Sequence, residues 1–266
     1  MKEPILSVRN LTKRFGGLTA VNNVSWDVYP GEVVGLLGDN GAGKSTLIKC
    51  ISGVYHAEEG EILFRGKTVT FPRPIDARRQ GIETIYQDLA LANNLDVGAN
   101  IFLGREVKKR YLGGLIKTLD DTHMLEESRK TLESLHIQFP TFTQPIENLS
   151  GGQRQAVAIA RAVYWDAKVM IMDEPTNNLG VPEQKKVLEL IRRLRDQGVP
   201  VILITHILPD VFAVTDRVTV MRRGRTVAEK VTTETNTEEL VQYMVGARDD
   251  TRPVGQALQR EVPLPH

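Results

Sequence analysis

The sequence has little of three features that mark secreted or membrane-embedded proteins. Cys50 is the only cysteine, so no internal disulfide can form, and the composition fits a reducing compartment such as the cytosol. We interpret Cys50 as a small core residue. No uninterrupted apolar run approaches the ~20 residues of a membrane span, and residues 1–4 lack the apolar core of a signal peptide. If the protein works at a membrane, we expect it to do so through partner subunits.

An excess of charge of one sign is also absent. The chain of 266 residues carries 34 Lys and Arg against 33 Asp and Glu, a formal net charge of +1. Because nucleic-acid binding depends on an excess of cations, the composition does not favour it. An apolar fraction of 41% and a charged fraction of 25% are ordinary for a globular protein of one large domain or two small ones. No internal repeat is visible.

The most informative stretch is a glycine-rich loop that reads G-D-N-G-A-G-K-S-T, the Walker A pattern. Apolar residues 33–37 before it predict a buried strand, and a helical pattern opens after it. In this context, inward-facing backbone N–H groups and the helix N-terminus bind a phosphate chain. We expect Lys44 to reach the β- and γ-phosphates and the Ser45 hydroxyl to ligate Mg²⁺. The predicted binding loop comprises Gly38, Asp39, Asn40, Gly41, Ala42, Gly43, Lys44, Ser45 and Thr46.

Two further strands end in polar residues that suit phosphate chemistry. Residues 169–173 are apolar up to Asp173, the Walker B form in which the aspartate belongs to the Mg²⁺ shell. Glu174 follows and could accept a proton from an attacking water. His206 comes just after the apolar strand predicted over residues 199–204. A lone histidine is usually structural, but at this end of a strand it can reach the γ-phosphate.

Three other features have two interpretations each on the sequence alone. Gln87 follows a predicted strand over residues 82–86, at the sheet edge where ligands bind, but a polar residue there is also unremarkable. Phe15 could stack on a base or be a core or surface aromatic at a turn. Residues 150–152, Ser-Gly-Gly before an amphipathic helix, could be an anion site or a plain helix cap.

The order of elements predicts an α/β protein. Strands over residues 5–8 and 24–28 read as half-buried and antiparallel, and residues 88–164 read as an inserted helix-rich subdomain with a loop near residues 113–114. Within that subdomain, a helix is predicted to start at residues 120–122, and the basic run at residues 108–110 to be a solvated loop. A hairpin is predicted around residues 223–224, followed by a last helix over residues 237–245 and a flexible tail over residues 247–266.

Taken together, five motifs occur in a characteristic order: the P-loop, Gln87, L-S-G-G-Q at residues 149–153, residues 169–174, and His206. In this order they resemble the ATP-binding subunits of ABC transporters. The five-residue LSGGQ signature is the most specific, because it separates this family from other P-loop ATPases. The resemblance covers residues 5–245, nearly the whole chain. It implies a RecA-like P-loop NTPase core with an N-terminal antiparallel β subdomain and a helical subdomain, together forming one domain over residues 1–246.

The resemblance also implies a role for each ambiguous residue. Phe15 would stack on adenine, and Gln87 would sense Mg²⁺ and the attacking water. Ser150 and Gly152 of the signature would contact the γ-phosphate of an ATP held by a second subunit, and Gly151 and Gln153 belong to the same implied nucleotide-binding set. The implied catalytic set is Glu174, His206, Gln87 and Lys44, and the implied Mg²⁺ ligands are Ser45, Gln87 and Asp173.

One position departs from the family pattern. After Walker B the family commonly reads S-A-L-D, whereas residues 177–180 here read N-N-L-G, so Gly180 replaces an aspartate that helps to couple the two sites of a dimer. Glu174 and His206 are both present, so we still expect hydrolysis. One P-loop and one signature cannot face each other within a subunit, and the resemblance therefore implies a homodimer that sandwiches two ATP molecules.

Residues 38–49, 51–55, 81–89 and 100–106 look like the ATP-binding subunits of monosaccharide importers of the ribose, xylose and fructose type. Because the chain has a single set of motifs, it resembles the single-domain members of this importer family, notably the fructose type. Such subunits lie on the cytoplasmic face of the inner membrane, pair with a transmembrane permease, and act indirectly with an extracytoplasmic sugar-binding protein. An amino-acid importer ATPase shares all five motifs and is the nearest alternative. A soluble ABC ATPase of DNA repair or ribosomes usually has two ATPase domains, coiled coils or basic extensions, and none is visible here.

Overall fold

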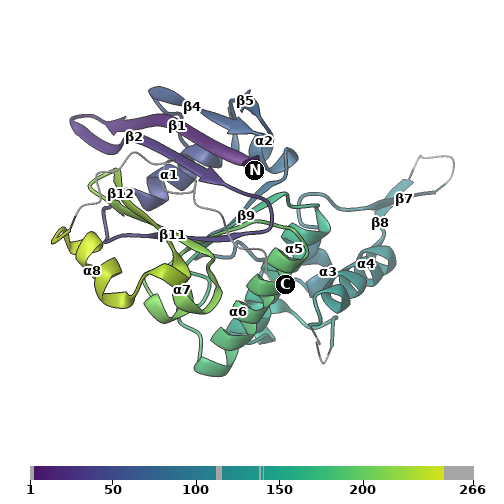
Figure 1. Ribbon diagram of the computed structural model, residues 1–266. Helices are drawn as coiled ribbons and strands as arrows, with labels where there is room; N and C mark the ends of the chain where they lie inside the picture. Colours follow the sequence, from purple (N-terminus) through teal and green to yellow (C-terminus); the bar gives the residue numbers. More distant parts are fainter. Residues whose placement is uncertain (1–2, 112–115, 138, 140, 249–266) are drawn as a thin grey trace.

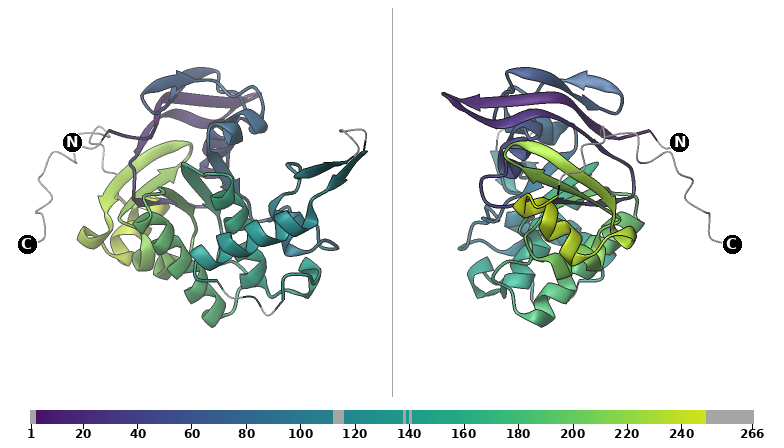
Figure 2. Two further views of the ribbon diagram at one scale, coloured as in Figure 1. Left: turned by 90° about the vertical axis from the view of Figure 1, so that its right-hand side faces the viewer. Right: turned by 60° about the vertical axis from the view of Figure 1, so that its left-hand side comes forward.

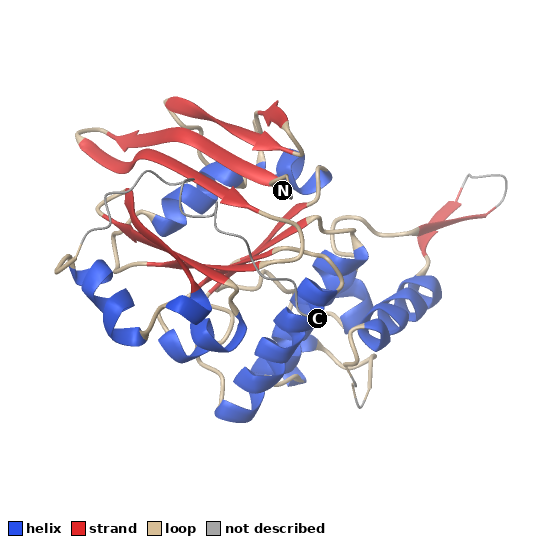
Figure 3. Cartoon of the chain, in the orientation of Figure 1, coloured by secondary structure: helices blue, strands red, loops and turns tan. Residues whose placement is uncertain are grey.

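The computed structural model describes residues 3–111, 116–137, 139 and 141–248, and the structural statements below refer to these residues. The chain forms an antiparallel sheet, a central sheet with helices on both faces, and a helical lobe at one side (Figure 1). Figure 3 separates these layers by secondary structure, with the two sheets in red and the helices in blue. The α/β class predicted from the sequence is confirmed.

The antiparallel sheet is formed mainly by the N-terminal segment. Its order is β2–β1–β4–β5, with β1 (Leu6–Phe15), β2 (Leu18–Val28), β4 (Glu59–Phe64) and β5 (Lys67–Val69). The two predicted strands are therefore confirmed, but both extend to the tight turn at residues 16–17. Register shifts between Val8 and Phe15 interrupt the alternation of apolar and polar residues. Because a bulge breaks the period of two, the sequence pattern loses its strand character there.

The central sheet brings the ends of five parallel strands to one edge. Its order is β12–β11–β3–β10–β9–β6, with β3 (Val33–Leu37), β6 (Ile82–Ile85), β9 (Val169–Asp173), β10 (Val201–Ile204), β11 (Arg217–Arg222) and β12 (Arg225–Val231). Only the predicted hairpin pair, β11 with β12, is antiparallel, and it is confirmed. The carboxyl ends of β3, β9 and β10 carry the P-loop, the acidic pair and His206 to the same edge.

Each face of the central sheet contributes to a separate apolar core. Val34, Ile171 and Ile202 pack on the side of α1 (Lys44–Ile51) and the antiparallel sheet, with Trp26 in the same cluster. Alternate residues such as Met172 and Leu203 face the opposite cluster. As side chains alternate along a strand, apolar runs without polar interruption indicate strands covered on both faces.

The remaining helices are short to medium in length. They are α2 (Pro74–Arg79), α3 (Val97–Ile101), α4 (Asp121–Ser134), α5 (Gly151–Tyr164), α6 (Val181–Asp196), α7 (Leu208–Val214) and α8 (Thr237–Val245), with 3-10 turns η2 (Ile146–Asn148) and η3 (Thr232–Glu234). The last helix has the predicted bounds. Among the described residues, we find no helix with the length and apolarity needed to cross a bilayer. The predicted tail lies outside the described residues from position 249 on.

The helical lobe packs on the core through α3, α4 and α5, and its apolar residues belong to the same cluster as that face of the sheet. The predicted start of α4 is confirmed, because the Asp120 side chain accepts a hydrogen bond from the backbone N–H of His123. Met124 and Leu132 of α4 and its C-cap residue Leu135 are buried, and Leu125 is half-buried.

The basic run at residues 108–110 is not a loop. It forms β7 (Lys108–Tyr111), which pairs with β8 (Ile116–Leu119) in a two-stranded ribbon that projects from the helical lobe (Figures 1 and 2). The prediction was wrong because this strand is defined by its cross-strand partners rather than by an apolar face. The loop predicted at residues 113–114 lies outside the described residues.

Candidate nucleotide-binding site

The P-loop joins β3 to α1 in a conformation that needs glycine. Gly38 and Gly43 have φ angles of 147° and 100°, which L-residues rarely adopt. A Cβ atom at Gly43 would lie 2.4 Å from the carbonyl oxygen of Ala20, and one at Gly38 would lie 2.2 Å from that of Met221. The loop is therefore packed against β2 and β11, with no room for larger residues at these two positions.

Lys44, the first residue of α1, folds back over this loop. Its Nζ donates hydrogen bonds to the carbonyl oxygens of Gly38, at 2.6 Å, and Asp39, at 3.1 Å. Burial lowers the pKa of Lys44, while the carboxylates of Glu174 and Asp173 act in the opposite direction. An ammonium group has three N–H donors, so this one can hold the loop and still offer a donor to an anion.

Phe15 lies at the rim of the pocket that contains the loop. This pocket of about 480 Å³ is lined on one side by Phe15, Leu18, Thr19 and Ala20, on the other by residues 40–46, and at one end by Arg223 and Gly224. The Phe15 side chain is 43% exposed, and its ring meets the edge of Tyr55 at a centroid distance of 5.1 Å. Phe15 is thus a surface aromatic opposite a phosphate-binding loop rather than a core residue.

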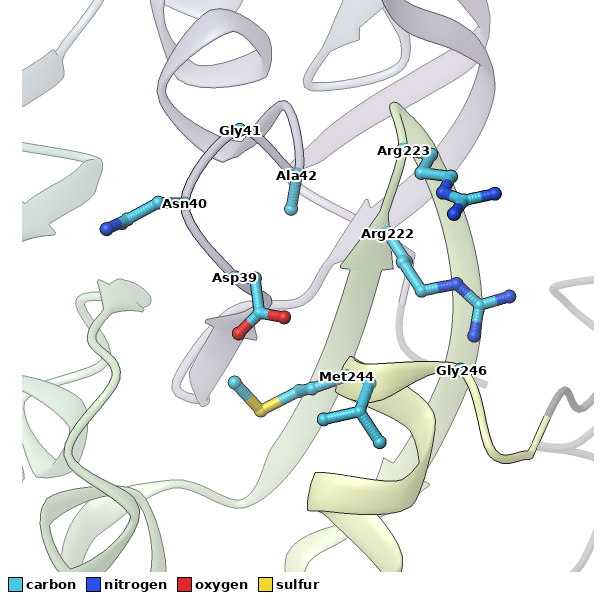
Figure 4. Close-up of a pocket in the computed structure, with 9 residues that line it drawn as sticks. Asp39, Asn40, Gly41, Ala42, Arg222, Arg223, Met244 and Gly246 are labelled. Carbon is cyan, nitrogen blue, oxygen red and sulfur yellow. The ribbon is translucent and has the colours of Figure 1, made fainter.

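Several residues that line the P-loop were not predicted as site residues. Arg223 lies in the β11–β12 turn, at a positive φ angle of 48°. A second pocket of about 350 Å³ lies at the other flank of the P-loop, and Figure 4 shows Asp39 of this loop across from Arg222 and Met244. No local motif marks these positions, because β11 and its following turn reach the loop through the pairing of β11 with β3, and Met244 through the packing of α8 on β11.

Asp173, Glu174 and His206 meet at the ends of β9 and β10. Glu174 leaves the strand with a φ angle of 52°, and its Oε1 lies 2.8 Å from Nδ1 of His206. Its other oxygen, Oε2, is buried and has no hydrogen-bond partner among the described residues. Burial raises the pKa of Asp173, and the neighbouring Glu174 carboxylate raises it further. Negative charge is therefore concentrated at the end of β9, where a bound cation or a proton would stabilise it.

The donors fit Mg²⁺ bound together with a nucleotide. Within the described part of the chain, no group of three or more His, Cys, Asp or Glu side chains could hold a metal by itself. Mg²⁺ is usually bound through one or two carboxylates together with substrate phosphates and water. Asp173 and the Ser45 hydroxyl are oxygen donors of this kind, so the residues present fit the ion.

Gln87 is the predicted catalytic residue that lies outside both the contact between Glu174 and His206 and the pocket at the P-loop. It lies exposed, two residues beyond β6, whose neighbour in the sheet is β9. No hydrogen bond joins its amide to the other described site residues. Its predicted role in sensing the metal and water stays a prediction.

The signature residues form a helix cap apart from the P-loop. Ser150 and Gln153 make a capping box at the start of α5: the Ser150 N–H donates to Oε1 of Gln153 at 2.9 Å, and the Gln153 N–H donates to Oγ of Ser150 at 3.3 Å. Ser150 is exposed. Among described residues, the pocket at the P-loop includes none of the signature. A cap with exposed N–H groups can also bind an anion, so the cap interpretation and the anion interpretation are compatible.

This fold and site define a P-loop nucleotide-binding protein. The family profile described as "ABC transporter" matches residues 21–177, more than half of the chain, and the chain belongs to this family. The resemblance found in the sequence is thereby confirmed.

Curated relatives point to import systems. The chain is 50% identical to the xylose/arabinose import ATP-binding protein of Sulfolobus acidocaldarius, covering 90% of this chain and 93% of the relative. It is 45% identical to the fructose import ATP-binding protein of Rhizobium meliloti, covering 94% and 97%. It is 40% identical to the ribose import ATP-binding protein of Escherichia coli O157:H7, covering 98% of this chain but only 49% of that relative.

Solved structures of the family have the same fold. An ATP-binding cassette of an ABC transporter in its ADP conformation superposes with a TM-score of 0.77 at 26% identity, covering 92% of this chain and 99% of the other. A nucleotide-free cassette gives a TM-score of 0.73 at 26% identity, covering 97% and 100%. The predicted P-loop NTPase fold with its two subdomains is confirmed.

Proposed function

We propose that this chain is the ATP-hydrolysing subunit that energises import of a monosaccharide through an ABC permease. The observation that carries the hydrolytic part is the contact between Glu174 and His206 at the sheet edge that also holds the P-loop. The import of a monosaccharide is supported by two relatives that match this chain over most of their length. Both are named as sugar import proteins. These relatives do not favour the amino-acid importer.

The pocket at the P-loop would hold ATP. Phe15 would stack on the base, and the backbone N–H groups of the loop and of α1 would bind the phosphates. Lys44 would exchange a carbonyl contact for a β- or γ-phosphate oxygen. Mg²⁺, when bound at Ser45 and Asp173, neutralises phosphate charge. Gln87 would complete the metal and water contacts after a movement of its loop.

Hydrolysis would use Glu174 as the proton acceptor for the attacking water. Its Oε1 is positioned by His206, and its buried Oε2 has no hydrogen-bond partner among the described residues and so keeps an unused acceptor. His206, with its side chain 62% exposed, can turn towards the γ-phosphate. Catalysis of this kind is mainly positioning and charge stabilisation.

A second copy of the chain would complete the site. The signature residues are separate from the P-loop pocket, so they can reach the γ-phosphate only of an ATP held by another subunit. We infer a head-to-tail homodimer with two ATP molecules. In that dimer Gly180, which caps α6 where the family has an aspartate, would lack a side chain for coupling the two sites.

The partners of the dimer would be membrane proteins. We infer that it binds permease subunits at the cytoplasmic face of the cell membrane and acts indirectly with an extracytoplasmic sugar-binding protein. The net charge of +1 gives no support for nucleic acid as a partner.

The test is a purification under conditions that trap the sandwich. The Glu174→Gln variant would be expressed in its native host and purified from gently solubilised membranes with ATP, and the co-purifying proteins would be identified. We expect a polytopic permease with a sugar-binding protein, whose ligand would identify the sugar. Recovery of only ribosomal or DNA-associated partners would contradict transport and leave the ATPase site standing.

A further inference from the structure

The signature of this subunit lies against a carboxylate from its own chain. Glu183, in the first turn of α6, lies alongside Gly152. A Cβ atom at Gly152 would lie 3.1 Å from Cβ, 3.4 Å from Cγ and 3.7 Å from the carboxyl carbon of Glu183. Gly151 has a similar neighbour, because its Cβ would lie 2.6 Å from Cδ2 of Leu179. The two signature glycines therefore let the start of α6 approach the start of α5.

The Glu183 carboxylate accepts a hydrogen bond from the backbone N–H of Gly180, and Glu183 lines one pocket together with Ser150, Gly152 and Gln153. The hydroxyl of Ser150 and the backbone N–H groups of Gly180 and Gly152 lower the pKa of Glu183, with Ser150 contributing most. The backbone nitrogen of Gly180, the N-cap residue of α6, lies 3.4 Å from Oε2 of Glu183. Glu183 is thus a carboxylate that lies beside Ser150 and Gly152.

These two residues are also the ones proposed to bind the γ-phosphate of the partner's ATP. The start of a helix of 14 residues favours an anion, and a capping hydroxyl adds a further donor. In the separate subunit the anion at this position is Glu183. A phosphate bound beside it would lie next to a group of like charge.

We propose that Glu183 is an internal anion that occupies the signature in the separate subunit and competes with the γ-phosphate of the partner's ATP. Its carboxylate raises the ATP concentration at which the dimer forms. It leaves the affinity of each subunit's own P-loop for nucleotide unchanged, because the signature lies outside that pocket. This inference rests on the ATP sandwich of the proposed function.

Glu183→Gln tests the charge without removing the cap. Either Glu or Gln at this helix position accepts the bond from the capping residue, so the start of α6 is preserved. A matched control is Glu189→Gln, which removes the same charge from the same helix. Glu189 is ion-paired with Arg193 and lies about 9 Å further along α6, at ~1.5 Å per residue.

The measurement is ATP-dependent dimerisation of the full chain. Each substitution is combined with Glu174→Gln, and the dimer is followed by size exclusion with light scattering as ATP is added. We expect Glu183→Gln to lower the ATP concentration at half dimerisation by roughly fivefold to tenfold, the size of one unfavourable charge contact. The Glu189→Gln control and the affinity of the monomer for ADP should not change.

Two outcomes overturn the inference, and they are distinguishable. If the Glu174→Gln parent stays monomeric at saturating ATP, the ATP sandwich is contradicted, and so is the proposed competition between Glu183 and the γ-phosphate. A parent that forms the dimer while Glu183→Gln needs the same ATP concentration, or more, overturns the competition alone and leaves the proposed function in place.

Discussion

Oε1 of Glu174 lies 2.8 Å from Nδ1 of His206, and Oε2 of the same carboxylate is buried without a hydrogen-bond partner. One oxygen is thus positioned by the histidine, while the other keeps an unused acceptor. An unpaired buried acceptor is unfavourable, so it favours a donor such as water at this point. The pair therefore combines a fixed orientation with a vacant acceptor, as a proton-accepting group requires.

The first prediction concerns this acceptor. Glu174→Gln replaces the carboxylate by an amide of the same size that does not accept a proton. We expect ATP to bind, the dimer to persist and the rate of hydrolysis to fall by about 10²-fold or more, the usual contribution of such a group. Phosphate release under saturating ATP measures this rate. Undiminished turnover in the variant would contradict the assignment of Glu174 as base.

The second prediction concerns the exposed ring at the pocket rim. Phe15→Ala removes the aromatic face proposed to stack on adenine. We expect KM for ATP to rise by roughly threefold to tenfold with kcat nearly unchanged, because stacking contributes about 0.5–1.5 kcal/mol and does not change during phosphoryl transfer. Phe15→Trp is the matched control and should keep the KM of the natural chain. An unchanged KM in Phe15→Ala would remove the stacking role.

The third prediction concerns the backbone of the P-loop. Gly43 and Gly41 both have positive φ angles, but only a Cβ atom at Gly43 would meet a backbone atom, the carbonyl oxygen of Ala20 at 2.4 Å. We expect Gly43→Ala to lower the free energy of unfolding by about 1–3 kcal/mol more than Gly41→Ala. Urea unfolding followed by circular dichroism measures the difference. Equal losses would mean that backbone conformation alone requires glycine at both positions.

The fourth prediction concerns the single thiol. Cys50 is buried, as its interpretation as a core residue requires, and burial raises its pKa to about 11. We expect the native protein to resist alkylation by iodoacetamide at pH 8 and the urea-unfolded chain to react readily, because the thiolate is the reactive form. Mass spectrometry measures the modification. Rapid modification of the native protein would show that the helix after the P-loop opens easily.

The raised pKa of Cys50 also has a consequence for stability. The folded chain holds the thiol proton more tightly than the unfolded chain, so the full stabilisation is present below the unfolded pKa of about 8.5. Stability should then fall as the pH rises from there towards the folded value of about 11. Cys50→Ala should weaken this part of the pH dependence, which urea unfolding at several pH values would measure.

Much of the nucleotide site could be predicted because its determinants are local. The P-loop needs a strand, glycines at φ angles that other residues avoid, and a helix start, and all three are adjacent in the sequence. The cap of α5 at Ser150 and the start of α4 at Asp120 are equally local, since a capping side chain bonds to a backbone group only three residues away.

Contacts between distant segments depend on tertiary structure instead. Glu174 and His206 are 32 residues apart and meet because β9 and β10 are neighbours in the sheet. Phe15 reaches the P-loop pocket through the packing of the antiparallel sheet on the core, and Glu183 reaches Gly152 through the packing of α6 on α5. The sequence by itself thus determined the phosphate loop, the helix caps and the family. The order of strands and the packing of helices decided which side chains meet, because such contacts depend on pairings between distant segments that no local pattern encodes.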